Sequence, residues 1–478
     1  MAREYGYLIN GEWKKSDEKK DIKSPYDRET AAVINIPDEQ SAKSSIGFAG
    51  KAFEDFRNSP SYVRSDILEK IADGIAAKKE ELARTLVLEG GKPLKTARVE
   101  VDRAVTTFTV GAEEANRFRG GELLPLDIVP GNEGMFGIVR RFPLGVVMGI
   151  SPFNFPLNLV AHKVAPAIAS GNVMLLKPAS QTPVSALMLG EIAVDSGLPG
   201  GVLNILPVPG SKTDAIIDDE RIRKISFTGS DEIGWRLKEK YPKKKVTLEL
   251  GGNAAVIIDE DPPDIEFAAS RNVWGAFYQA GQSCISVQRI YVQEKAYERF
   301  LDLFIRETRK LNLGDPMGED TDVGPVIDDG AADRIMKWIG QALDMGAKLL
   351  TGGGRDGRMI EPTVLTGVPA DANVSCSEVF GPVVHIEPYD DLDDAIRMVN
   401  DSRYGLQAGI FTKDIKKAFR AYEAIEVGGV IVNEYPSFRV ESMPYGGVKD
   451  SGVGREGLRH AIEDMTELKL MVTNLNYR

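Results

Sequence analysis

Residues 146–178 read VVMGISPFNFPLNLVAHKVAPAIASGNVMLLKP, which is a short apolar run, a helical pattern and a second short apolar run. Further apolar runs follow as VLNILP, KISFTGS and VTLELGG, with helical stretches between several of them. Buried strands that alternate with helices predict a parallel sheet with crossover helices, the doubly wound arrangement. Ligands of such sheets bind at the carboxyl ends of the strands. Lys177, Ser230 and Glu249 each lie at or near the end of such a run, so they are candidate ligand-binding residues.

A second series of the same kind begins near Asn253. AAVIID leads to a helical pattern at about 264–280 and then to ISVQRIYV, and later runs such as PVVHIEP, LQAGIF and GGVIVN alternate with further helices. We therefore predict a second α/β domain, joined to the first near residue 252. The chain length of 478 residues also requires at least two domains, because single cores stop growing beyond about 250–300 residues.

Two further segments differ from these domains. The first 120 residues have mostly helical periodicity, whereas residues 121–145, around GMFGIVRRF, have the extended pattern of a hairpin or arm. The C-terminal stretch DMTELKLMVTNL alternates polar and apolar residues like a strand but has no following strand to pair with. We interpret it as a terminal strand that pairs with another chain.

The composition argues against several classes of protein. The net charge of −12 disfavours a nucleic-acid or anionic-membrane partner, and no apolar run reaches the roughly 20 residues of a membrane-spanning helix. The start MAREYGYLING has no apolar signal core, so we expect a cytoplasmic protein. Two cysteines cannot form a disulfide framework. His162, His385 and His460 lie far apart without ligand spacing, so we expect no metal site.

Three glycine-containing loops are candidates for binding a dinucleotide. GGGRDG at 352–357 precedes a strand-like stretch and is typical of a hairpin, and GVGREG at 452–457 has too little chain after it for a βαβ unit. We interpret both as loops. FTGSDEIG at 227–234 instead follows a strand and opens a helix, so its backbone N–H groups and the helix N-terminus can hold a pyrophosphate.

Cys284 lies in AGQSCISVQR, residues 280–289, between a glycine-bearing turn and an alternating apolar run. Two interpretations stay open at this point. A free cysteine is often buried simply as a small apolar side chain. If Cys284 is a reactive thiol instead, a group other than histidine must activate it, because no local signature identifies a histidine partner.

Seven short stretches occur in one order along the chain. They are PFNFPL (152–157), LLKPAS (175–180), FTGS (227–230), LELGGN (248–253), GQSC (281–284), EVFGPV (378–383) and PYGGVKDSGVGREG (444–457). Together they resemble the aldehyde dehydrogenase superfamily over essentially the whole chain, and most closely its lactaldehyde and non-phosphorylating glyceraldehyde-3-phosphate dehydrogenases. The resemblance implies an α/β fold of two doubly wound Rossmann-like domains and a small β oligomerisation arm. The implied parts are an NAD(P)-binding domain (1–120 and 144–252), a catalytic domain (253–455) and the arm (121–143 and 456–478).

The resemblance also implies NAD(P)-dependent oxidation of a small-molecule aldehyde to a carboxylic acid, with Cys284 as the nucleophile. A thiolate adds to the aldehyde carbon, the resulting thiohemiacetal gives up a hydride, and the remaining thioester is hydrolysed. Such covalent catalysis divides a difficult oxidation into easier steps. Because an ordinary cysteine titrates near about 8.5, the site must favour the thiolate.

Two further residues match catalytic positions of the family. Asn154, in PFNFPL, matches the donor that stabilises the oxyanion together with the Cys284 backbone N–H. The alternative for Asn154 is a cap on the following helix. Glu249, in LELGG, matches the general base that activates the thiol or the deacylating water. A Glu at the end of a strand is otherwise a solvated or salt-bridged carboxylate.

The cofactor residues follow from the same resemblance. Lys177 is similar to the residue that binds the adenosine ribose, and Gly229 with Ser230 matches the turn that holds the pyrophosphate. Glu378 resembles the residue that binds the nicotinamide ribose, with Phe380 packed beside the ring. The alternative for Phe380 is a plain core position, because aromatic side chains are usually buried.

Ser180 departs from the commonest pattern of the family. Many NAD-preferring relatives have a glutamate where LLKPAS has Ser180, and this carboxylate binds the ribose hydroxyls. A carboxylate there would repel the 2′-phosphate of NADP, whereas a serine hydroxyl can donate a hydrogen bond to it. The sequence therefore predicts NADP as a cofactor, with NAD retained.

Substrate, partners and rival functions remain as hypotheses. Arg439, near the family's substrate entrance, can pair with a carboxylate or phosphate of the substrate, or it is an ordinary surface arginine. The arm implies a homodimer or homotetramer. A CoA-acylating relative would generally lack the glutamate at 249, and a non-catalytic member would not need Cys284, Asn154, Glu249 and Glu378 together.

Overall fold

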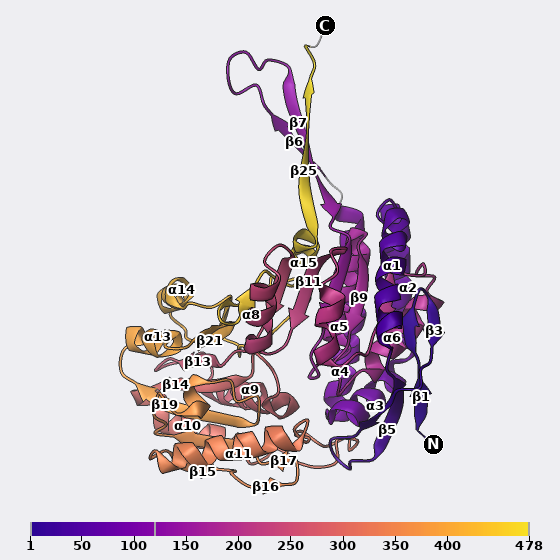
Figure 1. Cartoon of the computed structure of the whole chain (residues 1–478). Helices are drawn as coiled ribbons and strands as arrows, with labels where there is room; N and C mark the ends of the chain where they lie inside the picture. Colours follow the sequence, from indigo (N-terminus) through magenta and orange to yellow (C-terminus); the bar gives the residue numbers. More distant parts are fainter. Residues whose placement is uncertain (1, 119–120, 477–478) are drawn as a thin grey trace.

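The computed structural model describes residues 2–118 and 121–476, so the ends of the predicted domain ranges at residues 1, 119–120 and 477–478 lie outside it. Two sheets, each flanked by helices, form the body, and a narrow arm projects from it beside the chain's C-terminus (Figure 1). No helix of the described part of the chain is long and apolar enough to cross a membrane.

The first sheet has the strand order β24-β12-β11-β8-β9-β10-β2-β3. From β12 to β10 neighbouring strands are parallel, and β24 and β2 pair antiparallel with their neighbours. Its strands are β2 Tyr7–Ile9, β3 Glu12–Lys14, β8 Val146–Ile150, β9 Val173–Lys177, β10 Leu203–Ile205, β11 Ile222–Thr228, β12 Lys245–Glu249 and β24 Gly452–Val453. The accompanying helices are α1 Glu39–Phe56, α2 Ser61–Ala77, α3 Lys79–Gly90, α4 Leu94–Arg117, α5 Asn158–Ser170, α6 Val184–Asp195, α7 Asp214–Ile217 and α8 Asp231–Lys240.

The helical prediction for the first 120 residues is wrong at its start. A small sheet of β1 Arg3–Tyr5, β5 Thr30–Asn35 and β4 Lys19–Lys23 precedes α1. These strands are too short to be distinguished by periodicity, which needs a window of about 11–18 residues.

The second sheet has the order β15-β18-β19-β14-β13-β21-β22, and its strands are parallel from β18 to β22. Its elements are β13 Ala254–Ile258, β14 Val287–Gln293, β15 Lys348–Thr351, β18 Thr363–Thr366, β19 Val383–Tyr389, β21 Gln407–Phe411 and β22 Gly429–Val432, with α9 Ile265–Phe277, α10 Glu294–Thr308, α11 Asp329–Asp344, α12 Asn373–Cys376, α13 Leu392–Asn400 and α14 Ile415–Ala424. Two parallel sheets with crossover helices confirm the predicted fold class. The loop GGGRDG leads into the antiparallel pair β16 Arg355–Asp356 and β17 Met359–Ile360, so it is the predicted hairpin.

The arm consists of β6 Glu122–Pro125, β7 Met135–Pro143 and β25 Thr466–Asn474, paired antiparallel. The predicted arm segment 456–478 is too long at its N-terminal end. Helix α15 Leu458–Asp464 precedes β25, and its Leu458 and Ile462 belong to the core of the first domain. The arm strand therefore begins only at Thr466.

Candidate active site

The carboxyl ends of parallel strands bring the predicted residues together. Lys177 ends β9, Glu249 ends β12, and Ser230 follows β11 between them. They line one cavity of about 480 Å³. The same cavity is also lined by Asn154, Ser180, Gly229, Cys284, Glu378 and Phe380.

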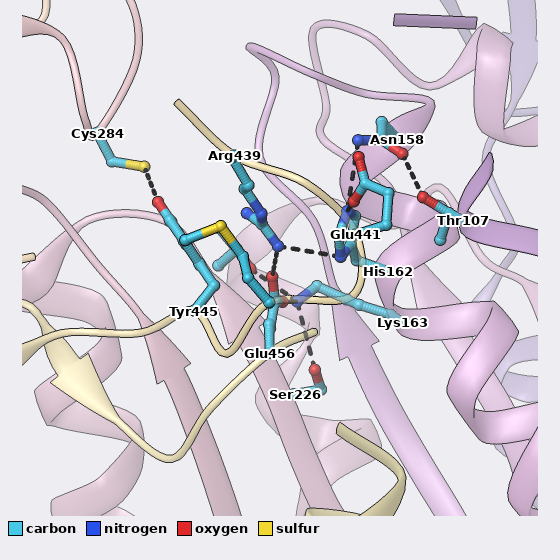
Figure 2. A network of polar contacts seen from close by, with 12 residues as sticks. Thr107, Asn158, His162, Lys163, Ser226, Cys284, Arg439, Glu441, Tyr445 and Glu456 are labelled. Atoms are coloured by element: carbon cyan, nitrogen blue, oxygen red, sulfur yellow. Dashed lines mark hydrogen bonds and ion pairs between the residues drawn. The ribbon is translucent and has the colours of Figure 1, made fainter. Parts of the chain in front are cut away.

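Cys284 is held by an unusual backbone after α9. Gln279, Ala280 and Gly281 have φ values of 56°, 53° and 69°, all in the left-handed region, and a Cβ at Gly281 would collide with the Gly381 carbonyl. Non-glycine residues in this region store strain, which proteins typically keep at functional sites. The Cys284 Sγ lies 3.0 Å from the Tyr445 hydroxyl (Figure 2). Burial raises the pKa of Cys284 to about 12, so the thiol of the free protein is protonated near neutral pH.

Asn154 does not cap the following helix. Its Nδ2 donates to the Gln282 carbonyl at 2.9 Å, while its Oδ1 has no hydrogen-bond partner among the described residues. The first turn of α5 is capped instead by Glu100, which accepts from the backbone N–H groups of residues 157 and 158 at 3.0 and 3.1 Å. Because Nδ2 carries two hydrogens, one remains for an oxyanion beside Cys284.

Glu249 is buried and forms no ion pair with the residues that the structure describes. Its side chain lies at the end of β12 with 3% exposure, and neither carboxylate oxygen has a hydrogen-bond partner in the described part of the structure. Burial and the neighbouring negative charge of Glu456 raise the pKa of Glu249 well above its ordinary value. A carboxylate with a raised pKa is a stronger base, which suits proton abstraction near neutrality.

A buried network of charged side chains lies next to Cys284 and Tyr445 (Figure 2). Glu456 pairs with Lys163 at 3.2 Å and with Arg439 at 3.0 Å, and the Arg439 guanidinium lies 3.7 Å from the centre of the Tyr445 ring. Although burial acts in the opposite direction, the two cations lower the pKa of Glu456 to about 2. The Arg439 side chain is only 6% exposed, so the interpretation of a surface arginine is wrong.

Glu441 extends this network to α4. It lies 2.8 Å from Arg103 Nε and 2.5 Å from His162 Nε2, and the other ring nitrogen of His162 lies 3.0 Å from Arg439 Nη2. The Nε of Arg439 has no hydrogen-bond partner among the described residues. Arg439 and Arg103 line a second cavity of about 230 Å³, together with Tyr278 and Phe438.

The two cavities share Asn154 and Cys284 in their walls. Cys284 and Asn154 therefore border both cavities. The sequence did not identify Arg103, His162, Lys163, Tyr445 or Glu456 as site residues. The helical periodicity of α4 and α5 shows only which face is buried, and Tyr445 and Glu456 lie within a recognised motif without a distinguishing signal.

The larger cavity fits a dinucleotide. Ser230 begins α8 without a side-chain hydrogen bond to its first turn, which leaves backbone N–H groups for a phosphate. Glu378 accepts from the Gly252 N–H at 2.9 Å, and a Cβ at Gly251 would lie 2.6 Å from Glu378 Oε2. Phe380 is partly exposed and packs edge-to-face on Phe153 with 5.7 Å between ring centres, so it forms part of the cavity wall rather than the core.

Lys177 is 7% exposed, and its Nζ donates to the Pro178 carbonyl at 3.1 Å. Burial, and then the charge of Lys20, lower the pKa of Lys177 to about 8. Residues 2–118 and 121–476 contain no cluster of three or more His, Cys, Asp or Glu side chains that could bind a metal ion.

Comparison with known proteins matches the chain throughout. The profile of the aldehyde dehydrogenase family covers residues 13–471. 3-Sulfolactaldehyde dehydrogenase of Priestia megaterium is 44% identical over 476 residues, which are 99% of each chain. The crystal structure of aldehyde dehydrogenase 21 from Physcomitrella patens, in complex with the reaction product succinate, has a TM-score of 0.98 and 46% identity over 100% of this chain and 99% of its own. The crystal structure of glyceraldehyde-3-phosphate dehydrogenase GapN from Methanocaldococcus jannaschii, complexed with NADP, has a TM-score of 0.91 and 39% identity. The match covers 96% of this chain and 100% of that one.

Proposed function

The chain belongs to the aldehyde dehydrogenase family, and from this premise we propose that Cys284 carries NAD(P)-dependent oxidation of an aldehyde to an acid by covalent catalysis. The observation that supports the proposal best is the position of Cys284 and Asn154 in the walls of both cavities. A dinucleotide enters the larger cavity and the aldehyde enters the smaller one, so the two reactants meet at the thiol.

The residues of the dinucleotide cavity have separate tasks. Lys177 and Ser180 bind the adenosine ribose side, Gly229 and Ser230 bind the pyrophosphate, and Glu378 binds the nicotinamide ribose. Phe380 limits the position of the ring from the cavity wall. The bound nicotinamide supplies a hydride acceptor.

The Cys284 thiol first gives its proton to water, and the thiolate adds to the aldehyde carbon, which forms a C–S bond, breaks the C=O π bond and leaves an alkoxide. The Asn154 amide and the Cys284 backbone N–H donate hydrogen bonds to this alkoxide, and one such donor is typically worth about 100- to 1000-fold in rate. Collapse of the alkoxide releases the C–H electron pair as hydride and leaves a thioester on Cys284.

Glu249 completes the reaction by hydrolysis. Its unpartnered carboxylate takes a proton from water, and the resulting hydroxide attacks the thioester carbon. The C–S bond breaks, the acid leaves and the thiolate is restored. A CoA-acylating enzyme would transfer the acyl group to CoA instead and would not need a buried base at this position.

We extend the proposal to a short aldehyde with a distal anionic group. Arg439, whose buried Nε has no hydrogen-bond partner among the described residues, and the partly exposed Arg103 both line the cavity that opens on Cys284, and guanidinium groups are suited to carboxylate, sulfonate or phosphate. The named substrate of one relative carries a sulfonate, the named product of the second carries two carboxylates, and the named substrate of the third carries a phosphate.

The arm supports the further proposal of a homodimer or homotetramer. Leu468, Leu470 and Val472 alternate along β25 and therefore share one face, and they are between 48% and 60% exposed in the single chain. A contiguous apolar strand face of this kind is costly in water unless another chain covers it. Light scattering that gave a monomer mass would contradict this proposal.

The covalent mechanism is tested by Cys284→Ala, with Cys376→Ala as the matched control. We expect Cys284→Ala to abolish reduced-cofactor formation from any aldehyde while NADP binding persists, and Cys376→Ala to be nearly silent. Substantial turnover by Cys284→Ala would disprove the covalent step.

The substrate class is tested by comparing kcat/KM for succinic semialdehyde and butanal, which share a four-carbon chain. Arg103→Met should lower kcat/KM for the anionic aldehyde by about 10- to 100-fold, because a hydrogen bond to a charged group contributes roughly 1.5–3 kcal/mol. The value for butanal should change by less than about 2-fold on the same grounds. Equal losses for both aldehydes would refute an anion-binding role.

A further inference from the structure

Lys20 reaches the dinucleotide cavity from a distant part of the chain. It lies on β4 of the small N-terminal sheet, and its Nζ donates to the Ser180 carbonyl at 2.8 Å. Ser180 lines the cavity beside Lys177. The ammonium group of Lys20 is therefore one hydrogen bond away from the cavity wall, at the end where the adenosine ribose is expected.

Two positive charges meet at this end of the cavity without an acidic partner. Neither Lys20 nor Lys177 forms an ion pair with any described residue; their hydrogen bonds go to the carbonyls of Ser180 and Pro178. The two charges are close enough that Lys20 contributes to the lowered pKa of Lys177. Like charges that repel each other in the free protein favour an anion that neutralises both.

We propose that Lys20 is a specificity-determining residue that, together with Lys177, binds the 2′-phosphate of NADP. The proposal rests on the dinucleotide site described under the proposed function and adds a residue from outside its motifs. A phosphate monoester carries about −1.5 to −2 charges at pH 7, whereas NAD presents only a neutral hydroxyl at this position. One hydrogen of the Lys20 ammonium group is donated to the Ser180 carbonyl, and two remain. The flexible side chain of Lys20 allows these two hydrogens to turn toward the phosphate.

The contribution of Lys20 must be one of selectivity rather than of general affinity. Its backbone carbonyl partner does not distinguish the two cofactors, and its side chain is largely exposed, so the effect will be screened by salt. An exposed pair of single charges contributes little to binding, and a phosphate with nearly two charges strengthens the attraction. We therefore expect a change of about 3- to 10-fold in the ratio of dissociation constants.

The experiment uses equilibrium binding, so it does not depend on turnover. The Kd values of NADP and NAD are measured by titration calorimetry for the full-length wild type, Lys20→Met and Lys19→Met. Lys19 is the matched control, because it directly precedes Lys20 in the same strand but pairs with Glu4 at 3.0 Å. Lys20→Met should raise the Kd of NADP by about 3- to 10-fold and leave the Kd of NAD within about 2-fold. Lys19→Met should change neither.

Two further measurements test the role of Lys20, and two outcomes would overturn it. Lys20→Arg should retain most of the NADP affinity, and added salt should weaken NADP binding more in the wild type than in Lys20→Met. If the wild type binds NADP but Lys20→Met keeps the wild-type NADP/NAD ratio, the role of Lys20 is refuted while the dinucleotide site stands. If the wild type binds NAD and not NADP, the NADP site and the role of Lys20 both fail.

Discussion

Tyr445→Phe isolates the contribution of one hydroxyl group to the reactivity of Cys284. The Tyr445 hydroxyl lies 3.0 Å from the Cys284 Sγ, and burial raises the pKa of Tyr445 well above its ordinary value, so the hydroxyl keeps its proton and donates to a thiolate. This hydrogen bond acts against the burial that raises the pKa of Cys284 to about 12. Phe keeps the ring that contacts the Arg439 guanidinium, so the variant removes little else.

The expected size of the effect follows from the geometry. Hydrogen bonds to charged groups are worth roughly 1.5–3 kcal/mol, and sulfur is a weak acceptor, so we take the lower limit. About 1.4 kcal/mol corresponds to one pKa unit, which raises the pKa of Cys284 by about one unit in Tyr445→Phe. Far below its pKa a thiol reacts in proportion to its thiolate fraction, so alkylation near neutral pH should be about tenfold slower.

The assay is iodoacetamide alkylation, followed separately for each cysteine by peptide mass spectrometry. Cys376 serves as the internal reference, because it is half-buried in α12 and its sulfur interacts with the Asp371 carbonyl and the Ser377 hydroxyl. The Cys284/Cys376 rate ratio should fall about tenfold in Tyr445→Phe, and a plot of rate against pH should show the shift directly. An unchanged ratio, or faster alkylation of Cys284, would refute the view that Tyr445 stabilises the thiolate.

Three other variants test separate parts of the site and the fold. Glu249→Gln should keep a stoichiometric burst of reduced cofactor but slow the steady state by about 100-fold or more, as expected for loss of a general base in deacylation; loss of the burst in stopped-flow absorbance would mean that Glu249 acts on the thiol instead. Ser180→Glu should shift the kcat/KM ratio toward NAD by weakening NADP binding, since a carboxylate about 4 Å from a phosphate charge costs roughly 1 kcal/mol even in water; an unaltered ratio would show that discrimination lies elsewhere. Glu89 caps α6 through the Val184 and Ser185 N–H groups, and burial raises the pKa of Glu89 from 4.5 to about 7. The folded state therefore binds the Glu89 proton more tightly than the unfolded state does. The free energy of unfolding of the wild type should fall as pH rises from about 5 to 8. In Glu89→Gln the free energy of unfolding, measured by urea titration, should fall less over this pH range, by up to about 3 kcal/mol. An identical pH dependence of both proteins would contradict the raised pKa of Glu89.

Local patterns were sufficient to predict the two α/β domains and the edge of the sheet that carries the cavity. Strand ends such as Lys177 and Glu249 are readable because apolar runs stop there, and parallel strands place all their carboxyl ends on one side. The same reasoning failed for the first strands, which are too short for a periodic signal. The arm segment 456–478 that the resemblance implied was too long, because α15 Leu458–Asp464 contributes to the first core.

The electrostatic environment of the site was not readable in this way. Arg439 has the sequence context of a surface loop, yet it is buried against Glu456 and Tyr445. Arg103 and Glu441 are 338 positions apart, and Lys20 and Ser180 are 160 apart. No periodicity connects such pairs, because they meet only where helices and loops from different parts of the chain pack on the same sheet.

The residue types at the site therefore follow from the sequence, and their protonation states follow from the packing. A cysteine, an asparagine and a glutamate in recognisable motifs are enough to predict the chemistry. Whether Glu249 is a free base or a salt-bridged carboxylate, and whether the Cys284 thiol has a donor, depends on water being excluded and on charges brought in from α4, α5 and the C-terminal segment. Desolvation and Coulomb interactions act through space rather than along the chain, so they are defined only once the tertiary structure has formed.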